Sequence, residues 1–368
     1  MIAGRYDAVV LGGGPAGLAA AIELRRRAEV SVLVADARDG GRERIGESAP
    51  PDLLAVLERL GLADRFRAGG HVPCPGHASV WGGERVGYND FILSPMGPAW
   101  RLDRRRFDGM LETAAVDAGA TVLRRTRFLR ADRDGLLLAL PDGKEKSVQA
   151  GYVIDATGPS ARFARSQGAR PRVDDRLFAL ARITEILAGT MTWQTLLEAT
   201  RDGWWYAARL PGEKVIAMFV TDRQGLRRIR EEDAWDRALA GTTLVGPTLS
   251  GLEPSWDRGA SRVHPVYSSI LDRTEGDGWI AAGDAASSYD PIAAQGIHKA
   301  ISDGIAAGRR SAAAIAGNTL EIDPDRIQTG FRDYCLNRRH LYGLERRWPD
   351  APFWSVRRER AEAAVSGC

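Results

Sequence analysis

Residues 6–36, YDAVVLGGGPAGLAAAIELRRRAEVSVLVAD, decide the fold of this chain. An apolar run over residues 6–11 reads as a buried strand, and a glycine-rich turn at residues 12–17 follows it directly. A helical run and a second short apolar run then end at Asp36. A strand, a glycine turn, a helix and a second strand within about 30 residues form a βαβ unit that binds dinucleotides. The pattern therefore predicts an α/β protein with a Rossmann-type domain at its N-terminus.

The glycines of this turn each have a separate physical task. Gly12 permits the tight turn, Gly14 lets the backbone approach a pyrophosphate, and Gly17 lets the helix pack against the strand. Free N–H groups at the start of the helix attract the phosphates. Asp36 lies 19 residues beyond Gly17, where its carboxylate can accept hydrogen bonds from ribose hydroxyls. The residues of the turn expected to hold the dinucleotide are Gly12, Gly14, Pro15, Ala16 and Gly17.

Two further stretches pair a strand with a small-residue turn. Residues 152–158 read YVIDATG, and residues 278–291 read GWIAAGDAASSYDP ahead of a helix predicted over residues 293–315. Asp284 can hold the ribityl hydroxyls of a flavin, with a helix cap as the alternative interpretation. The start of the long helix can direct its positive end at the flavin ring. The residues expected at this end of the cofactor are Pro291, Gln295, Gly296 and Ile297.

GGGPAG, DATG and GDAASSYDPIAAQG together resemble the motifs of the flavoprotein monooxygenase superfamily, of the p-hydroxybenzoate hydroxylase type. The resemblance covers nearly the whole chain and implies FAD as the cofactor. It also implies an α/β fold in which a glutathione-reductase-like FAD-binding domain is interleaved with an antiparallel-sheet substrate domain, followed by C-terminal helices. The FAD-binding domain is then expected to take residues 1–75, 99–174 and 262–320, the substrate domain residues 76–98 and 175–261, and the C-terminal helical segment residues 321–368.

The segment RIGESAPP, residues 44–51, is similar to a stretch of the flavin-dependent tryptophan halogenases. The resemblance implies that this segment straps over the FAD. Arg44 can then reach the pyrophosphate or ribose, while Glu47 and Ser48 lie near the edge of the flavin ring. A helix cap is the alternative for Glu47 and Ser48. A similar W-x-L-D-R stretch at residues 100–104 places Arg104 near the FAD and favours Asp103 as a helix N-cap.

Two departures from the halogenase pattern argue against halogenation. The halogenases use an active-site lysine shortly after the GES segment, and no lysine precedes Lys144 here. Their W-x-W-x-I-P signature is only partly matched by GWWYAARLP at residues 203–211.

The remaining resemblance is to halogenase-like flavoproteins that mature cysteine tryptophylquinone in partner oxidases. It is carried by GES…PP and by four further stretches, which are SVWG at 79–82, GPAWRLDRRRF at 97–107, DGWWY at 202–206 and ERRWPDAPFW at 345–354. It implies a tryptophan within a partner protein as a candidate substrate.

Aromatic residues on the predicted substrate sheet and beside the flavin motif are candidates for the substrate pocket. Such rings can stack on an indole or a phenol, and an aromatic core beneath the sheet is the alternative. The candidate substrate-binding residues are Trp81, Trp205, Tyr206 and Tyr289.

The function expected from this resemblance is hydroxylation of an electron-rich aromatic ring through a flavin C4a-hydroperoxide, with O2 as co-substrate. The cofactor carries this chemistry, so no catalytic residue is assigned. The ring belongs to a peptidyl tryptophan or to a small natural product. Alternatives are a reductase or dehydrogenase of the geranylgeranyl reductase type and a flavin-bearing factor that assembles a partner enzyme without turnover. No second GxGxxG marks an NAD(P)H domain, so either NAD(P)H docks transiently or a separate reductase supplies electrons.

Composition sets the remaining expectations. The longest apolar stretch, residues 8–22, is broken by glycines and a proline, and a membrane span needs about 18 apolar residues. The three cysteines are far apart without CxxC spacing, so no metal site is expected. The basic residues do not interleave with aromatics as a nucleic-acid groove requires. A cytoplasmic location without membrane or nucleic-acid partners is therefore expected.

Overall fold

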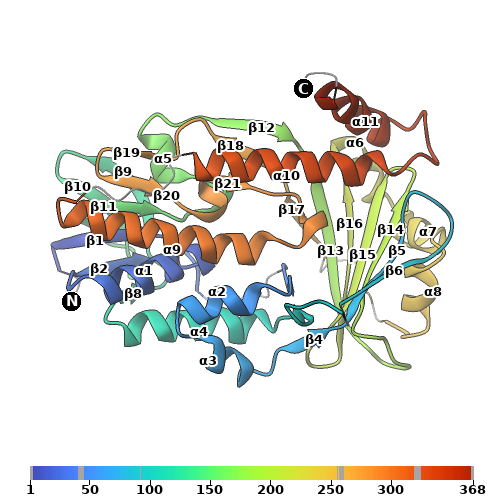
Figure 1. Cartoon of the computed structure of the whole chain (residues 1–368), viewed down its shortest axis with the longest axis horizontal. Helices are drawn as coiled ribbons and strands as arrows, with labels where there is room; N and C mark the ends of the chain where they lie inside the picture. The colour runs from blue at the N-terminus through green and yellow to red at the C-terminus, as the bar shows by residue number, and fades with distance from the viewer. Residues whose placement is uncertain are drawn as a thin grey trace.

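The computed structural model describes residues 3–39, 45–91, 93–254, 256, 261–318 and 325–365. Two large sheets stand side by side, with helices between and around them (Figure 1). The first sheet is built on the N-terminal βαβ unit, and the second is largely antiparallel. The predicted α/β architecture with a Rossmann-type domain, a second sheet and C-terminal helices is confirmed.

The first sheet centres on β1 (Arg5–Leu11), which is parallel to both of its neighbours. Its apolar residues are buried on both faces, as parallel sheets covered by helices require. A hairpin of β9 (Arg127–Asp132) and β10 (Gly135–Ala139) pairs with the first half of β11 (Glu145–Asp155). In spatial order the strands of the main path are β19 (Glu275–Gly276), β20 (Trp279–Ala281), β11 (Glu145–Asp155), β1, β2 (Val32–Ala35) and β8 (Thr121–Leu123), and the hairpin is β9 (Arg127–Asp132) and β10 (Gly135–Ala139).

Helix α1 (Pro15–Arg27) packs against the long helix α9 (Gly296–Ile315) through small residues. A side chain at Gly304 would come within 2.2 Å of the carbonyl oxygen of Ala16, so the two helix backbones lie very close together. The predicted start of α9 at residue 293 was three residues early. Residues Pro291–Ala293 form a short 3-10 turn, η4, and Ala294 takes a left-handed conformation before the helix begins.

Shorter helices complete the first domain and its junction with the second. Asp103 caps the helix Arg104–Asp117, α4, by accepting a hydrogen bond from the Arg106 amide, which confirms its predicted role. These helices are α2 (Leu53–Arg59), α3 (Ala63–Arg67), α4 (Arg104–Asp117) and α5 (Arg162–Ser166). Two small sheets bridge the domains, namely β3 (Ser48–Ala49), β7 (Ala99–Arg101) and β4 (Val72–Cys74), and β12 (Pro171–Asp175), β18 (Ser268–Leu271) and β21 (Ser287–Ser288).

The second sheet contains the strands expected in residues 76–98 and 175–261, and it also takes in one strand just past the expected boundary. Its outer face is covered by α6 (Arg223–Ile229), α7 (Ala234–Ala240) and α8 (Val245–Ser250). In spatial order the strands are β17 (Arg262–Pro265), β13 (Phe178–Glu185), β16 (Lys214–Thr221), β15 (Gly203–Leu210), β14 (Thr195–Thr200), β5 (Gly76–Val80) and β6 (Gly87–Asp90).

The C-terminal segment forms α10 (Arg326–Gly343) and α11 (Pro352–Val365). Figure 1 shows α10 running above α9 from the first sheet to the second. Its far end packs with Trp354 of α11 against Trp204 on the inner face of the second sheet. The segment therefore joins both domains.

Candidate active site

A cavity of about 580 Å³ opens where the parallel strands of the first sheet end. Strands β1, β2, β11 and β20 all point their carboxyl ends at it. In open α/β sheets, ligands bind in the crevice at these ends. Of the residues predicted to bind the cofactor, those that line this cavity are Gly12, Gly14, Pro15, Ala16, Asp36, Arg104 and Asp284.

The glycine turn is a tight cradle. Gly12 has a φ of +110°, and a side chain there would lie 2.2 Å from the carbonyl oxygen of Ala156. A side chain at Gly17 would lie 1.9 Å from the Gly12 oxygen, so Gly17 sits behind the turn and not in the cavity. Gly14 faces the cavity with no atom nearer than 3.6 Å to the position of a side chain. The backbone at the start of α1 is therefore open to a diphosphate, as this turn requires.

Asp36 and Asp284 lie in the same cavity. Asp36 follows β2, and its carboxylate accepts a 2.8 Å hydrogen bond from Arg38. Asp284 lies within the 3-10 turn η3 (Gly283–Ala285) and has no capping role there. Its side chain is accessible from the cavity, yet the cavity walls surround it closely, and this poor hydration raises the pKa of its carboxyl group against the opposing effect of Lys299.

Arg104 links the cavity to the segment at residues 45–51 that was expected to cover the FAD, which is called the strap below. Its guanidinium donates to the backbone oxygens of Ile45, at 2.7 Å, and Gly46, at 3.1 Å, while its Nε is buried without a partner among the described residues. A buried guanidinium N–H without an acceptor is costly, so an anionic group in the cavity would satisfy it. Arg44, which was expected to act beside it, lies outside the described residues. The cradle, the two carboxylates and this orphaned donor fit an adenine dinucleotide.

The four residues expected at the flavin ring lie beyond the lining of this cavity. Pro291 begins η4, Ile297 is buried in the core, and Gln295 lines a different cavity. Gly296, the first residue of α9, is exposed, and a side chain there would meet nothing within 4 Å.

Glu47 and Ser48 belong to a polar cluster with Tyr206 and Arg101, in which Ser48 is half-buried and the other three residues are buried. The Tyr206 hydroxyl donates to Glu47, lies 2.7 Å from the Ser48 hydroxyl and accepts a 2.7 Å hydrogen bond from Arg101. Burial raises the pKa of Tyr206, so its hydroxyl stays protonated. Neither Glu47 nor Ser48 caps a helix, because Ser48 lies in β3, Glu47 directly precedes it, and the next helix, α2, starts at Leu53 with Asp52 at its N-cap position. Arg101 belongs to the stretch GPAWRLDRRRF, but the sequence assigned it no role. Its burial depends on contacts with strands that are distant in sequence, and no local motif reports such contacts.

The aromatic candidates do not gather in one pocket: Trp81 and Tyr206 belong to one cluster on the inner face of the second sheet, whereas Trp205 and Tyr289 lie elsewhere. Trp205 is fully buried behind the second sheet, with ring centroids 4.9 Å from Phe219 and 4.6 Å from Trp235, and it lines neither of the two cavities described here. Trp81 donates a 2.7 Å hydrogen bond to the Leu341 oxygen and packs on the C-terminal helices. Tyr206 faces the inner side of the sheet.

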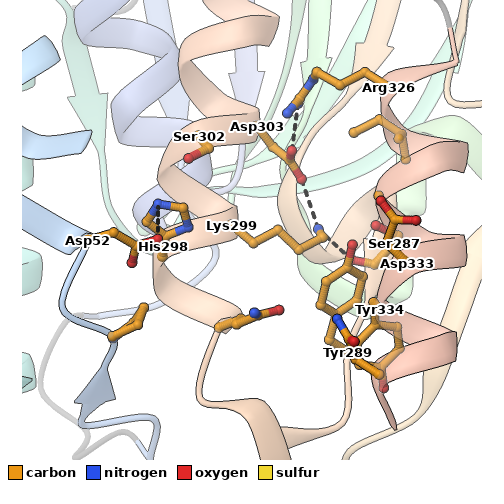
Figure 2. Close-up of a pocket in the computed structure, with 15 residues that line it drawn as sticks. Asp52, Ser287, Tyr289, His298, Lys299, Ser302, Asp303, Arg326, Asp333 and Tyr334 are labelled. Carbon is orange, nitrogen blue, oxygen red and sulfur yellow. Dashed lines mark hydrogen bonds and ion pairs between the residues drawn. The ribbon is translucent and has the colours of Figure 1, made fainter. Parts of the chain in front are cut away.

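Tyr289 lines a second cavity of about 330 Å³ between α9 and α10. Figure 2 shows its ring beside that of Tyr334, with which it stacks at 3.9 Å. The cations Lys299 and Arg326 of this cavity are already paired, because Asp303 accepts hydrogen bonds from Lys299, at 2.8 Å, and from Arg326, at 2.6 Å. Lys299 also donates to the backbone oxygens of Gly283 and Ser287. The sequence offered no motif for this cavity.

No cluster of three or more His, Cys, Asp or Glu residues that could hold a metal ion occurs in the part of the chain that is described. Within those same residues, no helix is long and apolar enough to cross a membrane.

Comparisons with known proteins bear on both the cavity and the second sheet. The model of a family described as FAD binding domain matches residues 5–321. LodB, a putative FAD-dependent oxidoreductase of Marinomonas mediterranea, is 28% identical over 362 residues, which is 96% of each chain. The myxobacterial chondrochloren halogenase CndH has the same fold, with a TM-score of 0.82 at 24% identity over 99% of this chain and 89% of the halogenase. QhpG, a peptidyl tryptophan dihydroxylase essential for tryptophylquinone cofactor biogenesis, has a TM-score of 0.75 at 25% identity over 96% of this chain and 79% of QhpG.

Proposed function

The chain belongs to the FAD-binding domain family and is an FAD-dependent oxidoreductase, and from this premise we propose that it is a monooxygenase that hydroxylates an electron-rich aromatic ring. The observation that carries the proposal is that one cavity holds the glycine cradle, the ribose-side carboxylate Asp36 and the carboxylate Asp284. In FAD the diphosphate lies between the adenosine ribose and the ribityl chain, and the cavity offers a partner for each of the three, namely Asp36 for the ribose, the cradle for the diphosphate and Asp284 for the ribityl hydroxyls.

The residues of the chain would bind and orient the cofactor. The diphosphate lies against Gly12 and Gly14 at the uncapped start of α1, Asp36 accepts from the adenosine ribose, and Asp284 accepts from the ribityl hydroxyls. Arg104 supplies its unused Nε–H to the phosphates. When bound, FAD supplies the electron and oxygen chemistry, with O2 as the second substrate.

The flavin ring is proposed to lie beside η4 and the start of α9. Gly296 leaves open space there, and α9 begins without a side-chain cap, so its first N–H groups remain available to an electron-rich atom. The inner face of the second sheet lies across from this position, with Tyr206 and Glu47 holding the strap against it. These buried groups would shape the substrate side and limit the access of water.

Oxygenation is favoured over halogenation by the lysines. The chain has four lysines, and the first of them is Lys144. The halogenase lysine would be expected much earlier, shortly after the GES segment. Lys299, the lysine beside the cofactor motif, already donates to two backbone oxygens and to Asp303. Its ammonium group is therefore engaged and has no donor to spare for a halogen species.

We propose a tryptophan within a partner protein as the substrate. The resemblance to flavoproteins that mature tryptophylquinone supports this choice, as does the likeness to QhpG over 96% of the chain. A small aromatic natural product is the alternative ring, and NAD(P)H or a separate flavin reductase is the source of electrons.

Oxygen-isotope labelling tests this proposal. The holoenzyme is incubated under oxygen-18 gas with the precursor of a tryptophylquinone-type oxidase from the same genome, with NAD(P)H alone or with an added flavin reductase, and peptides are measured by mass spectrometry. Oxygen-18 in a tryptophan residue is the expected result. Bromination in the presence of bromide would establish a halogenase instead, and maturation without oxygen incorporation would establish a binding factor. Reduction of an unsaturated acyl chain without oxygen uptake would establish the reductase alternative.

A further inference from the structure

Three residues of α10 contact one residue of the flavin motif. Tyr334, Arg338 and Tyr342 are spaced four residues apart, so they form a single stripe along the helix. All three reach Asp290, the residue immediately before the turn η4. The contact between this stripe and Asp290 was not apparent from the sequence, because the whole of α9 lies between Asp290 and α10 along the chain.

The contacts satisfy Asp290 almost completely. Its Oδ2 accepts hydrogen bonds from Tyr342, at 2.8 Å, and from the Nε of Arg338, at 3.2 Å. Its Oδ1 accepts a 2.9 Å bond from the Ile292 amide inside η4, and its own amide donates to the Tyr334 hydroxyl at 2.6 Å. The carboxylate is buried, and a buried carboxylate held by this many donors is confined to one position.

The hydroxyl of Tyr342 has a defined direction. The indole of Trp204, on the inner face of the second sheet, donates to it at 2.9 Å, and an indole N–H can only donate. Tyr342 must therefore use its own proton for Asp290. Burial raises the pKa of Tyr342, so this proton is retained.

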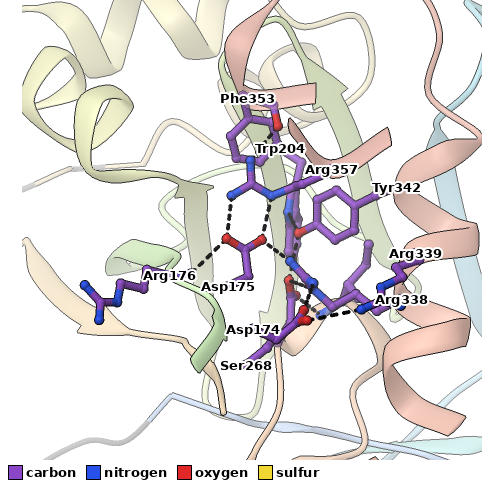
Figure 3. Close-up of polar contacts among 12 residues, drawn as sticks. Asp174, Asp175, Arg176, Trp204, Ser268, Arg338, Arg339, Tyr342, Phe353 and Arg357 are labelled. Atoms are coloured by element: carbon purple, nitrogen blue, oxygen red, sulfur yellow. Dashed lines mark hydrogen bonds and ion pairs between the residues drawn. The ribbon is translucent and has the colours of Figure 1, made fainter. Parts of the chain in front are cut away.

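Arg338 is itself held in place. It donates to Asp174 at 3.1 Å and to Asp175, and Arg357 of α11 grips Asp175 with two hydrogen bonds of 2.8 and 3.1 Å. Figure 3 shows Arg338 and Arg357 converging on these carboxylates beside Tyr342. The two aspartates end β12, where the chain passes from the first domain to the second sheet. The stripe is thus anchored at both domains.

We propose that Tyr334, Arg338 and Tyr342 are positioning residues that hold Asp290 and thereby aim the start of α9 at the flavin ring. The inference rests on the proposed placement of that ring. Asp290 fixes η4, η4 leads through the left-handed Ala294 into α9, and the first N–H groups of α9 then face the ring. A looser turn would weaken the stabilisation of the negatively charged reduced ring by the helix start.

Tyr342→Phe tests the proposal in the full-length holoenzyme with little change in volume. Tyr152→Phe is the matched control, because it removes a hydroxyl from another buried tyrosine, on β11, that is not among the hydrogen-bond partners of Asp290. FAD affinity is measured by fluorescence, and the midpoint potential of the bound flavin by dye-coupled reduction. We expect Tyr342→Phe to retain FAD and to shift the potential to more negative values, with a changed visible spectrum, while Tyr152→Phe leaves both unchanged.

A second pair of variants keeps the proposal testable if Tyr342→Phe fails to fold. Arg338→Lys keeps the charge but loses the fork that reaches Asp290, whereas Arg339→Lys alters a neighbour that donates a hydrogen bond to Asp174 and not to Asp290. Only the first is expected to shift the potential. Unchanged potentials in both Tyr342→Phe and Arg338→Lys, or equal shifts in the controls, would overturn the positioning role. If the unaltered protein takes up no FAD, the proposed function itself fails, and the two failures are therefore distinguishable.

Discussion

Arg101 donates a 2.7 Å hydrogen bond to the hydroxyl of Tyr206, and this contact joins the small sheet of the strap to the large antiparallel sheet. Arg101 also donates to Thr195 on β14, at 2.8 Å, and Glu47 balances its charge from 3.9 Å. Every member of this network is buried. The strap and the sheet that enclose the proposed substrate side cannot separate without exposing or isolating a buried charge, which is strongly unfavourable.

Tyr206→Phe is expected to lower the free energy of unfolding by about 1–3 kcal/mol, because Glu47 and Arg101 each lose a buried hydrogen-bond partner. FAD should remain bound, since Tyr206 does not line the cofactor cavity. Urea unfolding and the FAD content of the purified protein measure these effects. Tyr88→Phe, at a residue that is 68% exposed, serves as the control. A variant as stable as the parent would show that the network does not hold the strap.

Asp284→Ala is expected to weaken FAD binding by about tenfold or more, because hydrogen bonds to a charged group contribute about 1.5–3 kcal/mol. Asp284 lines the cofactor cavity, whereas Asp277 is exposed beside β20 outside its lining, so Asp277→Ala is the matched control. Titration of the apoprotein with FAD, followed by flavin fluorescence, gives both affinities. Equal affinities in the two variants would refute the role of Asp284.

Gly17→Ala is expected to abolish FAD binding and to destabilise the fold, because the new methyl group would lie 1.9 Å from the Gly12 oxygen and push α1 away from the turn. Gly109→Ala in α4 makes the same chemical change where nothing lies within 4 Å. There the substitution should stabilise the protein by about 0.5–1 kcal/mol through helix propensity. Thermal unfolding with and without FAD separates the two results, and a Gly17→Ala protein that binds FAD normally would contradict the cradle.

Trp205→Ala is expected to cost about 3–5 kcal/mol of stability, because it empties a fully buried site packed against Phe219 and Trp235. If Trp205 instead contacted the substrate, the Trp205→Ala protein would stay stable and keep its FAD but would turn over slowly. Denaturant unfolding and turnover of the same preparation distinguish these two outcomes.

His71 is expected to make the fold sensitive to mild acid. Its Nδ1 accepts a hydrogen bond from the Asp103 amide at the start of α4, and burial lowers the pKa of the imidazole to about 4. The unfolded chain takes up a proton near pH 6.5 and the folded chain does not, so stability falls as the pH drops from about 6.5 to about 4, by up to about 3 kcal/mol.

Urea unfolding across that range checks the prediction for His71. His71→Gln should make the pH profile shallower, with the remaining slope coming from groups such as His77, whose pKa burial also lowers to about 4, while His340→Gln, at an exposed residue, should leave it unchanged. A profile that stays equally steep in His71→Gln would assign the acid sensitivity to other groups.

The cofactor half of the site could be predicted because its signals are local. A βαβ unit is contiguous, so the spacing from Gly12 to Gly17 and on to Asp36 determines which residues meet at the strand ends. The GD turn at Asp284 follows a strand in the same way, and the structure places it in the same cavity. Helix α9 was also predictable from its pattern, although its exact start was not, because the 3-10 turn η4 and the left-handed Ala294 precede the helix.

The substrate half depended on contacts that no local pattern encodes. Trp205 and Tyr206 are neighbours on β15, and a strand sends successive side chains to opposite faces, so only the packing of α6–α8 on one face decided which ring would be core. The same holds for Arg101 and for the grip of α10 on Asp290. The sequence by itself determined the dinucleotide cradle, because the strand, the glycine turn and the helix that form it are consecutive in one βαβ unit. Only the tertiary structure decided which buried charges pair across the domains, because that pairing depends on how distant segments pack.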